Sequence, residues 1–213
     1  MTASPDPGSL EVRPPLQQRS REAWQRVLDA GVALVEEGGY EAFTIAAVCE
    51  RAQVPPRALY ARVDNKDALF LAVYEHGMAR VLAEHAVFDD GERWQGLTAD
   101  RVVAVAVAEV AGMFARHTAF LRAIVLISGA HPEVYRRGVR YTQELGDRFT
   151  ARLLSVGAGA GEPDPRAAVR AAFNAVFSSL VLRNAYGPAF ATPADSEDDF
   201  RRTLTAMVSR YLL

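Results

Sequence analysis

Residues 44–66 of this chain read TIAAVCERAQVPPRALYARVDNK and contain two short helical patterns close together. The pattern predicts one helix over 44–52, with Thr44 as its N-cap, and another over 55–63 that opens on two prolines. A third helix is expected from about residue 65 to residue 81. Because only two or three residues join them, the two short helices must cross steeply, which is the helix-turn-helix arrangement.

The rest of the 213-residue chain has apolar residues at a period near 3.6 almost throughout. A first helix has an apolar face from Trp24 to Val35 and is expected to end at Gly38-Gly39, because glycine readily takes the left-handed conformation that ends helices. Longer amphipathic helices follow, and one of them is expected to begin at Asp164-Pro165. The sequence therefore predicts an all-α fold, with an N-terminal three-helix head and a C-terminal helical bundle.

Composition excludes several classes of protein. With 50% hydrophobic residues, the chain is not disordered throughout, and 24 Lys and Arg against 26 Asp and Glu give a net charge of −2. Any nucleic-acid surface must therefore come from local placement of basic residues. Cys49 is the single cysteine, which excludes an internal disulfide and a cysteine zinc site. No apolar run approaches the ~20 residues that span a bilayer. We expect a cytoplasmic protein without a membrane partner.

The chemistry of residues 44–66 suits the recognition of DNA. A recognition helix must be short, present its N-terminal end to the major groove and be flanked by groups that hold phosphates. The helix over 55–63 fits this role, and Thr44, Tyr60 and Lys66 offer a hydroxyl, a phenol and an ammonium to phosphates. This stretch contains four basic and two acidic residues, which gives a local charge of 4 − 2 = +2.

The stretch from Ser20 to Arg80 resembles the DNA-binding head of the TetR family of transcriptional regulators. Residues at the spacing of that family are Ala30, Leu34, Gly38-Gly39-Tyr40, Thr44-Ile45, Val48, Ala52, Val54, Leu59-Tyr60, Lys66 and Leu69. The resemblance implies that Thr44, Tyr60 and Lys66 contact phosphates. Three departures from the family pattern bear on the operator sequence: Gln53 stands where the turn usually has glycine, Arg57 where a small residue is common, and Arg62-Val63 where a His-Phe pair is usual.

Base reading is assigned to Arg57, because a guanidinium on guanine O6 and N7 is the commonest specific contact. Pro56, Ala58 and Ala61 are expected to touch only thymine methyls or sugars. Arg62 is either a phosphate contact or a solvated neighbour of Asp64. Three further arginines precede or open the first helix, where they either reach the DNA or form a solvated basic arm: Arg13, Arg19 and Arg21.

The chain is expected to divide into a flexible arm (residues 1–15), a helix-turn-helix DNA-binding domain (16–66) and a ligand-binding and dimerisation domain (67–213). The last two helices carry apolar stripes wider than one core face needs, which predicts a homodimer formed through them. In the TetR family the C-terminal helices hold a small-molecule effector that alters the separation of the two recognition helices. The resemblance therefore implies a ligand-responsive regulator, expected to be a repressor released from a palindromic operator.

Candidate effector contacts are the polar or aromatic groups on apolar helix faces, each with ordinary core packing as the alternative. They are Trp94, Met113, Phe114, His117, Arg122, Tyr141, Phe173, Asn174 and Phe177. His117 and Asn174 are the most notable, because a polar group on a buried stripe needs a partner. The abundance of Phe and Met favours an apolar or aromatic effector.

An enzyme is not expected, because the chain has no GxSxG, no P-loop and no GxGxxG after a strand. The four histidines show no i, i+4 pairing, so no metal site and no cofactor are expected. A remaining alternative is a helical dimer that binds a small molecule or a protein and no longer binds DNA. The presence together of Thr44, Tyr60 and Lys66 argues for the DNA-binding reading.

Overall fold

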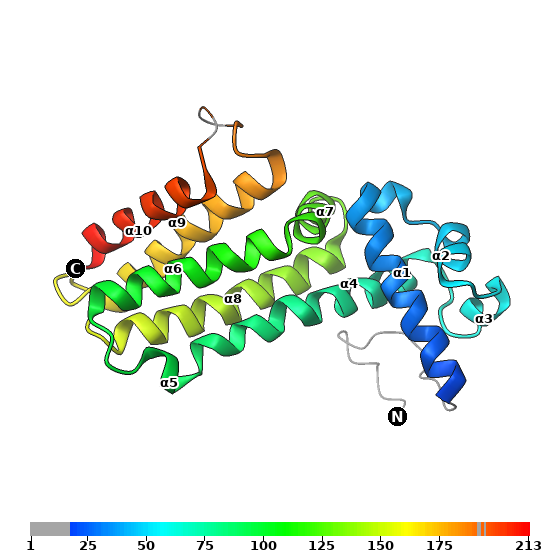
Figure 1. The fold of residues 1–213 in the computed structure, drawn as a ribbon, viewed down its shortest axis with the longest axis horizontal. Coiled ribbons are helices and arrows are strands. Elements are labelled where there is room, and N and C mark those ends of the chain that lie inside the picture. Colours follow the sequence, from blue (N-terminus) through cyan, green and yellow to red (C-terminus); the bar gives the residue numbers. More distant parts are fainter. Residues whose placement is uncertain (1–17, 191–192, 194) are drawn as a thin grey trace, which may run out of the picture. The chain divides into compact units, whose positions relative to one another are not determined.

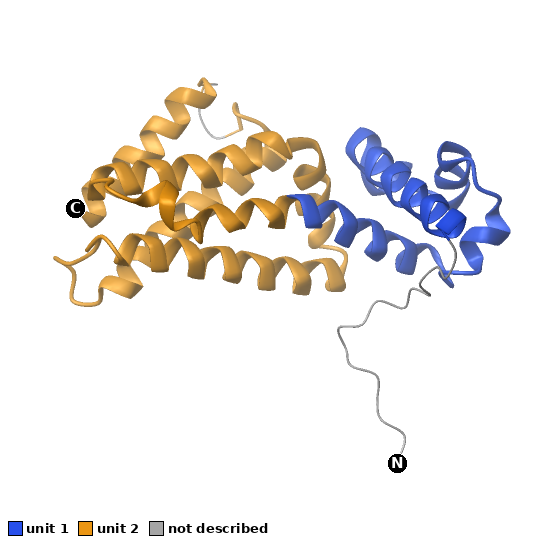
Figure 2. Cartoon of the chain, turned by 60° about the horizontal axis from the view of Figure 1, so that its bottom comes forward, with its two compact units in different colours: residues 1–80 blue, residues 81–213 orange. Residues whose placement is uncertain are grey.

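The computed structural model describes residues 18–190, 193 and 195–213. This part of the chain is helical and contains no strand, which confirms the all-α prediction (Figure 1). The flexible arm expected over residues 1–15, with Arg13, lies outside the described residues. The chain divides into two compact units, residues 1–80 and residues 81–213 (Figure 2). The functional boundary expected after Lys66 remains a prediction.

The N-terminal unit is built from a long first helix, two short helices and most of a fourth. They are α1 (Gln18–Ala42), α2 (Ile45–Ala52), α3 (Pro56–Tyr60) and α4 (Lys66–Ala83). The helical turns of α1 are interrupted at Gly38 and at Gly39, whose φ of 64° lies in the left-handed region. The helix stop predicted at these two glycines is therefore confirmed as a kink, after which one more helical turn follows.

The ends of α2 and α3 show how local chemistry fixes the helix-turn-helix. The Thr44 hydroxyl accepts a hydrogen bond from the Ala47 amide at 3.1 Å, which confirms the predicted N-cap. Gln53 takes the left-handed conformation, with φ 55° and ψ 48°, at the position where glycine would be at ease. Pro55 and Pro56 then open α3.

Helix α3 is shorter than expected, because it ends at Tyr60 and not at Val63. After Tyr60 the Arg62 amide donates to the Leu59 carbonyl at 2.9 Å, three residues back, so the last turn tightens and the backbone leaves the helix. Arg62 consequently lies beyond the end of α3.

The core of the N-terminal unit is apolar and tightly packed. Phe43, Leu59 and Phe70 are at most 1% exposed, and the rings of Phe43 and Phe70 meet edge-on with centroids 5.3 Å apart. Gly31 permits α1 and α4 to approach closely, since a Cβ atom there would lie 2.4 Å from Cγ2 of Val73. This packing holds the two short helices on a rigid support.

The C-terminal unit is a bundle of longer helices. It contains η1 (Glu84–Phe88), α5 (Gly91–Trp94), α6 (Ala99–Arg116), α7 (Thr118–Ser128), α8 (Pro132–Leu154), α9 (Pro165–Tyr186) and α10 (Glu197–Leu212). Helix α9 packs against α7, α8 and α10, and α6 packs against α10 (Figure 1). Asp164 caps α9 by accepting from the Ala167 amide at 3.0 Å, which confirms the predicted start.

The segment 89–96 contains the single turn α5, because the Asp90 carboxylate accepts from the Glu92 amide at 3.2 Å and so caps a short helix. Among the described residues no single helix is long and apolar enough to cross a membrane. Helices α6 and α7 have the length and apolar composition of a membrane span only when they are taken together, and they are bent by 86° at their junction.

Candidate nucleic-acid interface

Helix α3 presents its polar side to solvent. Leu59 is 1% exposed and anchors the helix in the core, whereas Pro56, Arg57 and Ala58 are exposed and Tyr60 is 51% exposed. The guanidinium of Arg57 has no hydrogen-bond or ion-pair partner within the described part of the chain, and only its backbone carbonyl is engaged, by the Ala61 amide at 3.2 Å. The guanidinium is therefore available for a ligand, as base reading requires.

Thr44 lies at the exposed beginning of α2. Its hydroxyl oxygen accepts from the Ala47 amide, which leaves the hydroxyl hydrogen to donate to a phosphate oxygen. The free amides of the first turn of α2 add to this donor set. The predicted phosphate contact is thus compatible with the capping role of the same residue.

Lys66 is braced by an aromatic ring. Its Nζ lies 3.9 Å from the centroid of the Tyr40 ring and donates to the Tyr40 carbonyl at 3.4 Å. The Tyr40 hydroxyl in turn donates to Asp67 at 2.8 Å, and burial together with this hydrogen bond raises the pKa of Tyr40 to about 12. Tyr40 therefore positions Lys66 at the start of α4. Sequence analysis placed Tyr40 in the family pattern but did not find this role.

Two other basic residues of the stretch 44–66 are already engaged. Arg51 forms a bidentate pair with Glu37, at 2.6 and 2.5 Å, and these hydrogen bonds lower the pKa of Glu37. Arg62 donates to the Ser20 hydroxyl and lies over the Trp24 ring, 5.8 Å from its centroid. Arg62 thus joins the end of α3 to α1, and its role as a phosphate contact stays a prediction. Arg57 and Lys66 remain as the available cations.

The remaining candidates of the N-terminal unit are placed as follows. Arg19 and Arg21 are exposed in the first turn of α1. Cys49 is 5% exposed, and burial raises the pKa of its thiol, as befits a core residue.

Most of the effector candidates belong to the core of the C-terminal unit. Met113, Phe114, Tyr141 and Phe173 are buried, and the half-buried Phe177 meets the rings of Phe114 and Phe173 with centroids 5.5 and 5.6 Å apart. These rings form one aromatic cluster that spans α6 and α9.

Trp94 and His117 have partners inside the protein. The Trp94 indole donates to the Val87 carbonyl at 2.7 Å. The His117 ring lies 2.7 Å from the Glu84 carboxylate, whose pKa is lowered first of all by hydrogen bonds from Arg116. Arg122 and Asn174 are exposed, so the burial expected for Asn174 is not found.

A pocket of about 350 Å³ opens between α6, α7 and α9. Only two of the nine effector candidates, Phe114 and Arg122, line it. Sequence analysis missed the polar residues that complete the lining, and no motif could have indicated them: Thr118, Arg183, Asn184 and Glu197.

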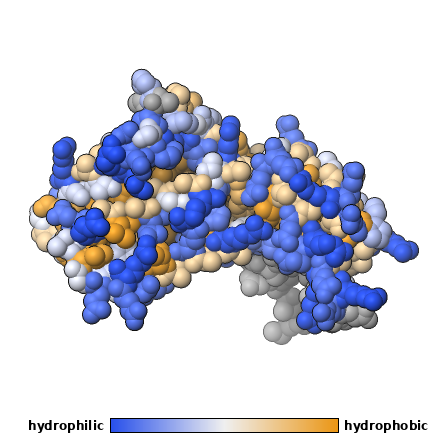
Figure 3. Space-filling model, in the orientation of Figure 1, coloured by the Kyte–Doolittle hydropathy of each residue, from blue (hydrophilic) through white to orange (hydrophobic). Residues whose placement is uncertain are grey.

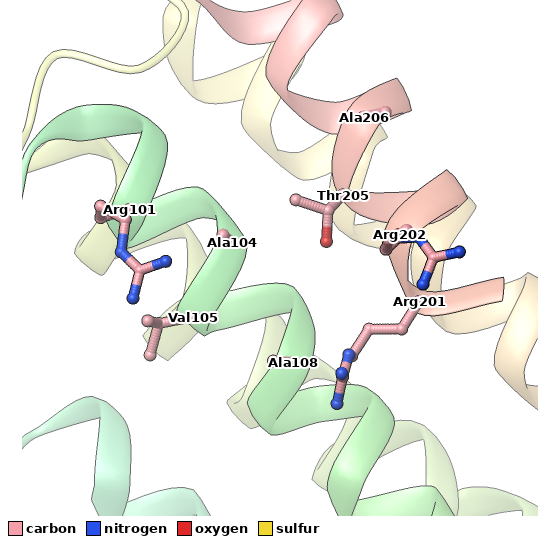
Figure 4. Close-up of a pocket in the computed structure, with 8 residues that line it drawn as sticks. All are labelled: Arg101, Ala104, Val105, Ala108, Arg201, Arg202, Thr205 and Ala206. Atoms are coloured by element: carbon pink, nitrogen blue, oxygen red, sulfur yellow. The ribbon is translucent and has the colours of Figure 1, made fainter. Parts of the chain in front are cut away.

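A second, more open groove of about 630 Å³ lies between α6 and α10 and has none of the nine candidates in its lining (Figure 4). Small side chains such as Ala104 and Ala108 form its floor, and three guanidinium groups surround it, from Arg101, Arg201 and Arg202. Arg201 and Arg202 form ion pairs with Asp198 and Asp199 of their own helix.

Large apolar side chains remain exposed at the last two helices. On the face seen in Figure 3, hydrophobic residues reach the surface near the end of α10 and the beginning of α6. The large apolar residues of α9, α10 and their flanks that are at least 40% exposed are Leu182, Tyr186, Phe190, Met207, Tyr211 and Leu213.

Among the described residues no group of three or more His, Cys, Asp and Glu side chains could hold a metal ion.

Residues 27–73 match the model of the bacterial regulatory proteins of the tetR family. No curated protein matches the sequence. Solved structures share the fold over nearly the whole chain. Salmonella enterica GusR has a TM-score of 0.66 at 18% identity, covering 92% of this chain and 98% of that one. A tetR-family regulatory protein from Rhodococcus RHA1 has a TM-score of 0.66 at 20% identity, covering 89% and 96%. Bacillus subtilis FadR, solved with stearoyl-CoA, has a TM-score of 0.64 at 14% identity, covering 89% and 100%.

Proposed function

We propose that this chain, whose residues 27–73 match the model of the bacterial regulatory proteins of the tetR family, acts in the cytoplasm as a homodimeric repressor that a small effector releases from a palindromic operator. In this proposal the chain is a DNA-binding transcriptional regulator and not an enzyme. The observation that carries the proposal is the exposed side of α3, where Arg57 is unpaired within the described residues and Lys66 is braced nearby in sequence by Tyr40.

Each candidate group has its own task in this proposal. Arg57 reads a guanine, Pro56 and Ala58 touch sugars or thymine methyls, and Thr44, Tyr60 and Lys66 hold phosphates. Arg62 either adds a phosphate contact or only braces α3 against α1. Phosphate contacts set the position of the protein on DNA and base contacts set its sequence preference.

The exposed apolar residues of α9 and α10 support the dimer. Six large side chains at least 40% exposed would be covered by the same surface of a second copy. Two heads in a symmetric dimer read two half-sites about one helical turn apart, which requires an inverted repeat.

The pocket between α6, α7 and α9 supports an effector site, since its volume of about 350 Å³ is in the range of small-molecule sites. An effector that changes the separation of the two recognition helices would prevent both from docking at once. Stearoyl-CoA in the Bacillus subtilis FadR structure is an example of a small molecule held by this fold.

The test is selection of fragmented genomic DNA by purified protein at about 150 mM salt, where nonspecific retention is weak. The protein is unfolded and refolded beforehand, so that no co-purified effector holds it in the released state. Recovery of one inverted repeat is expected. Lys66→Ala and Tyr60→Phe should lower the affinity for all sequences, whereas Arg57→Ala should relax the preference at one base pair by about 1–3 kcal/mol.

Arg166→Ala is the matched control, because it removes the same charge from an exposed position on α9. Failure to enrich any sequence would refute DNA recognition and favour a helical dimer that binds a small molecule or a protein. An unchanged preferred site in Arg57→Ala would refute the assignment of Arg57.

A further inference from the structure

The pocket between α6, α7 and α9 combines an apolar wall with polar side chains, two of which have hydrogen-bonding groups without a partner in the described part of the protein. Phe114 and Ala115 of α6 and Leu180 of α9 form the apolar part of its lining. Thr118, Arg122 and Asn184 contribute the polar part. A site of this composition suits a small molecule with an apolar body and one polar group.

The first group without a partner is the side-chain amide of Asn184. Its Nδ2 atom is buried and has no hydrogen-bond partner within the described residues. Buried polar side chains in native proteins are nearly always paired, because an unpaired donor loses its contacts with water and gains nothing in exchange. Because Asn184 lines the pocket, a rotation of its side-chain amide would bring this donor to an acceptor supplied by a ligand.

The second group without a partner is the exposed guanidinium of Arg122, because no described residue forms an ion pair or hydrogen bond with it. The other arginine of the lining, Arg183, is committed to the protein. It pairs with Asp195 at 2.6 Å and with Glu197 at 3.0 Å, and its guanidinium carbon lies 4.4 Å from the Phe200 ring centroid. Of the two guanidinium groups in the lining, only that of Arg122 is therefore available to a ligand.

We infer that this pocket binds a small organic carboxylate, whose oxygens accept from Arg122 and Asn184 and whose apolar body lies against Phe114 and Leu180. A planar carboxylate matches the guanidinium fork in geometry as well as in charge. The inference rests on the proposed function and sharpens it, since it assigns an acidic head group to the effector expected to be apolar or aromatic.

The same pocket reaches the connection between α9 and α10. Gly187, Pro188 and Glu197 belong to its lining, and Glu197 is held by Arg183. A ligand here lies against the residues that follow α9 and against the first residue of α10, which carries part of the proposed dimer surface. The groove between α6 and α10 is a weaker candidate, because Arg201 and Arg202 already have carboxylate partners.

Isothermal titration calorimetry of the full chain without DNA tests the inference. The probes are benzoate and octanoate, with benzamide and octanamide as uncharged counterparts. At least one acid is expected to bind at least tenfold more tightly than its amide, and Arg122→Ala should weaken that acid at least tenfold. Arg166→Ala removes an exposed arginine of α9 that does not line the pocket, and its affinity should be unchanged.

Asn184→Leu separates binding from structure. Leucine has the same branching at Cγ as asparagine and needs no hydrogen bond, so the melting temperature of the free protein should stay the same or rise, while acid affinity falls. The inference is overturned if neither acid binds, if the amides bind as well as the acids, or if Arg122→Ala leaves acid affinity intact.

The two proposals fail separately. If an acid binds and genomic selection recovers no DNA, the pocket assignment stands and the regulator does not. If an inverted repeat is recovered and no acid binds, the regulator stands and the carboxylate assignment is withdrawn.

Discussion

The two units place their functional groups in different ways. In the N-terminal unit the candidate DNA contacts come from 23 consecutive residues, and each is set by a cap, a tight turn or a neighbouring ring. In the C-terminal unit the pocket is lined by residues from Ala111 to Glu197, which meet only after four helices have packed. Local chemistry therefore specifies the first site and tertiary packing the second.

The two units also treat polar groups differently. Arg57 and Tyr60 are exposed on a short helix, where solvent satisfies them until a ligand arrives. In the C-terminal unit His85 is 6% exposed and Asn184 has a buried amide without a partner among the described residues. Buried polar groups make stability sensitive to pH and to ligands, so the two units should respond differently to perturbation.

The largest expected effect is confined to the N-terminal unit. Gly31→Leu places a side chain where a Cβ atom would already lie 2.4 Å from Val73, so α1 and α4 must separate there. We expect the loss of about 3 kcal/mol of stability in residues 18–80. Hydrogen exchange should show faster exchange in those residues and unchanged protection beyond residue 81. Gly129→Leu, at a glycine with open space around it, is the control. Equal loss of protection in both units would contradict two independent cores.

The second effect belongs to the C-terminal unit. Burial first, and Arg148 next, lower the pKa of His85 to about 4 from the ordinary 6.5. Between these two values the unfolded chain binds a proton that the folded chain does not, so stability is full above pH 6.5 and falls as the pH drops to 4. We expect a loss of about 2 kcal/mol over this range.

Urea unfolding at several pH values measures this loss, and His85→Leu should remove it. The one histidine of the N-terminal unit, His76, differs from His85 in that its ring is partly exposed and lies 2.8 Å from Asp29. An unchanged pH dependence in His85→Leu would assign the acid sensitivity to other groups.

The smallest effect is a gain. Gln53 has φ 55°, and glycine takes this conformation without the steric cost that a side chain brings. Gln53→Gly should therefore raise the stability of the N-terminal unit by about 1 kcal/mol, measured as a higher melting temperature. Ala61→Gly, at a right-handed position in the next turn, should lower it instead. Two changes of the same sign would show that the left-handed turn is not strained.

The fold was predictable where the signals are local. The cap at Thr44, the break at Gly38-Gly39 and the start at Asp164-Pro165 each depend on residues within one turn of the helix end. The length of α3 was not predictable, because its end depends on a tighter hydrogen bond from Arg62 to Leu59 that no residue pattern marks.

The candidate sites follow the same rule. Exposure of Arg57 and Tyr60 follows from the helical position of Leu59, which must face the core. Asn174 was expected on the buried stripe of α9 but is exposed. Successive helical residues are about 100° apart, and Val176 and Leu180 fix the buried face on the other side. The brace of Lys66 by Tyr40 joins two residues 26 positions apart and needed the folded structure.

Lys66 is the one lysine of the sequence. Apart from the amine at the beginning of the chain, its side chain is the only place where an amine-directed reagent can attach. Acylation there would replace the cation beside Tyr40 with a neutral amide, and a DNA phosphate bound to the ammonium would shield it. Mass spectrometry of a single labelled peptide would then report occupancy of the DNA surface, without an engineered tag and without any knowledge of the operator.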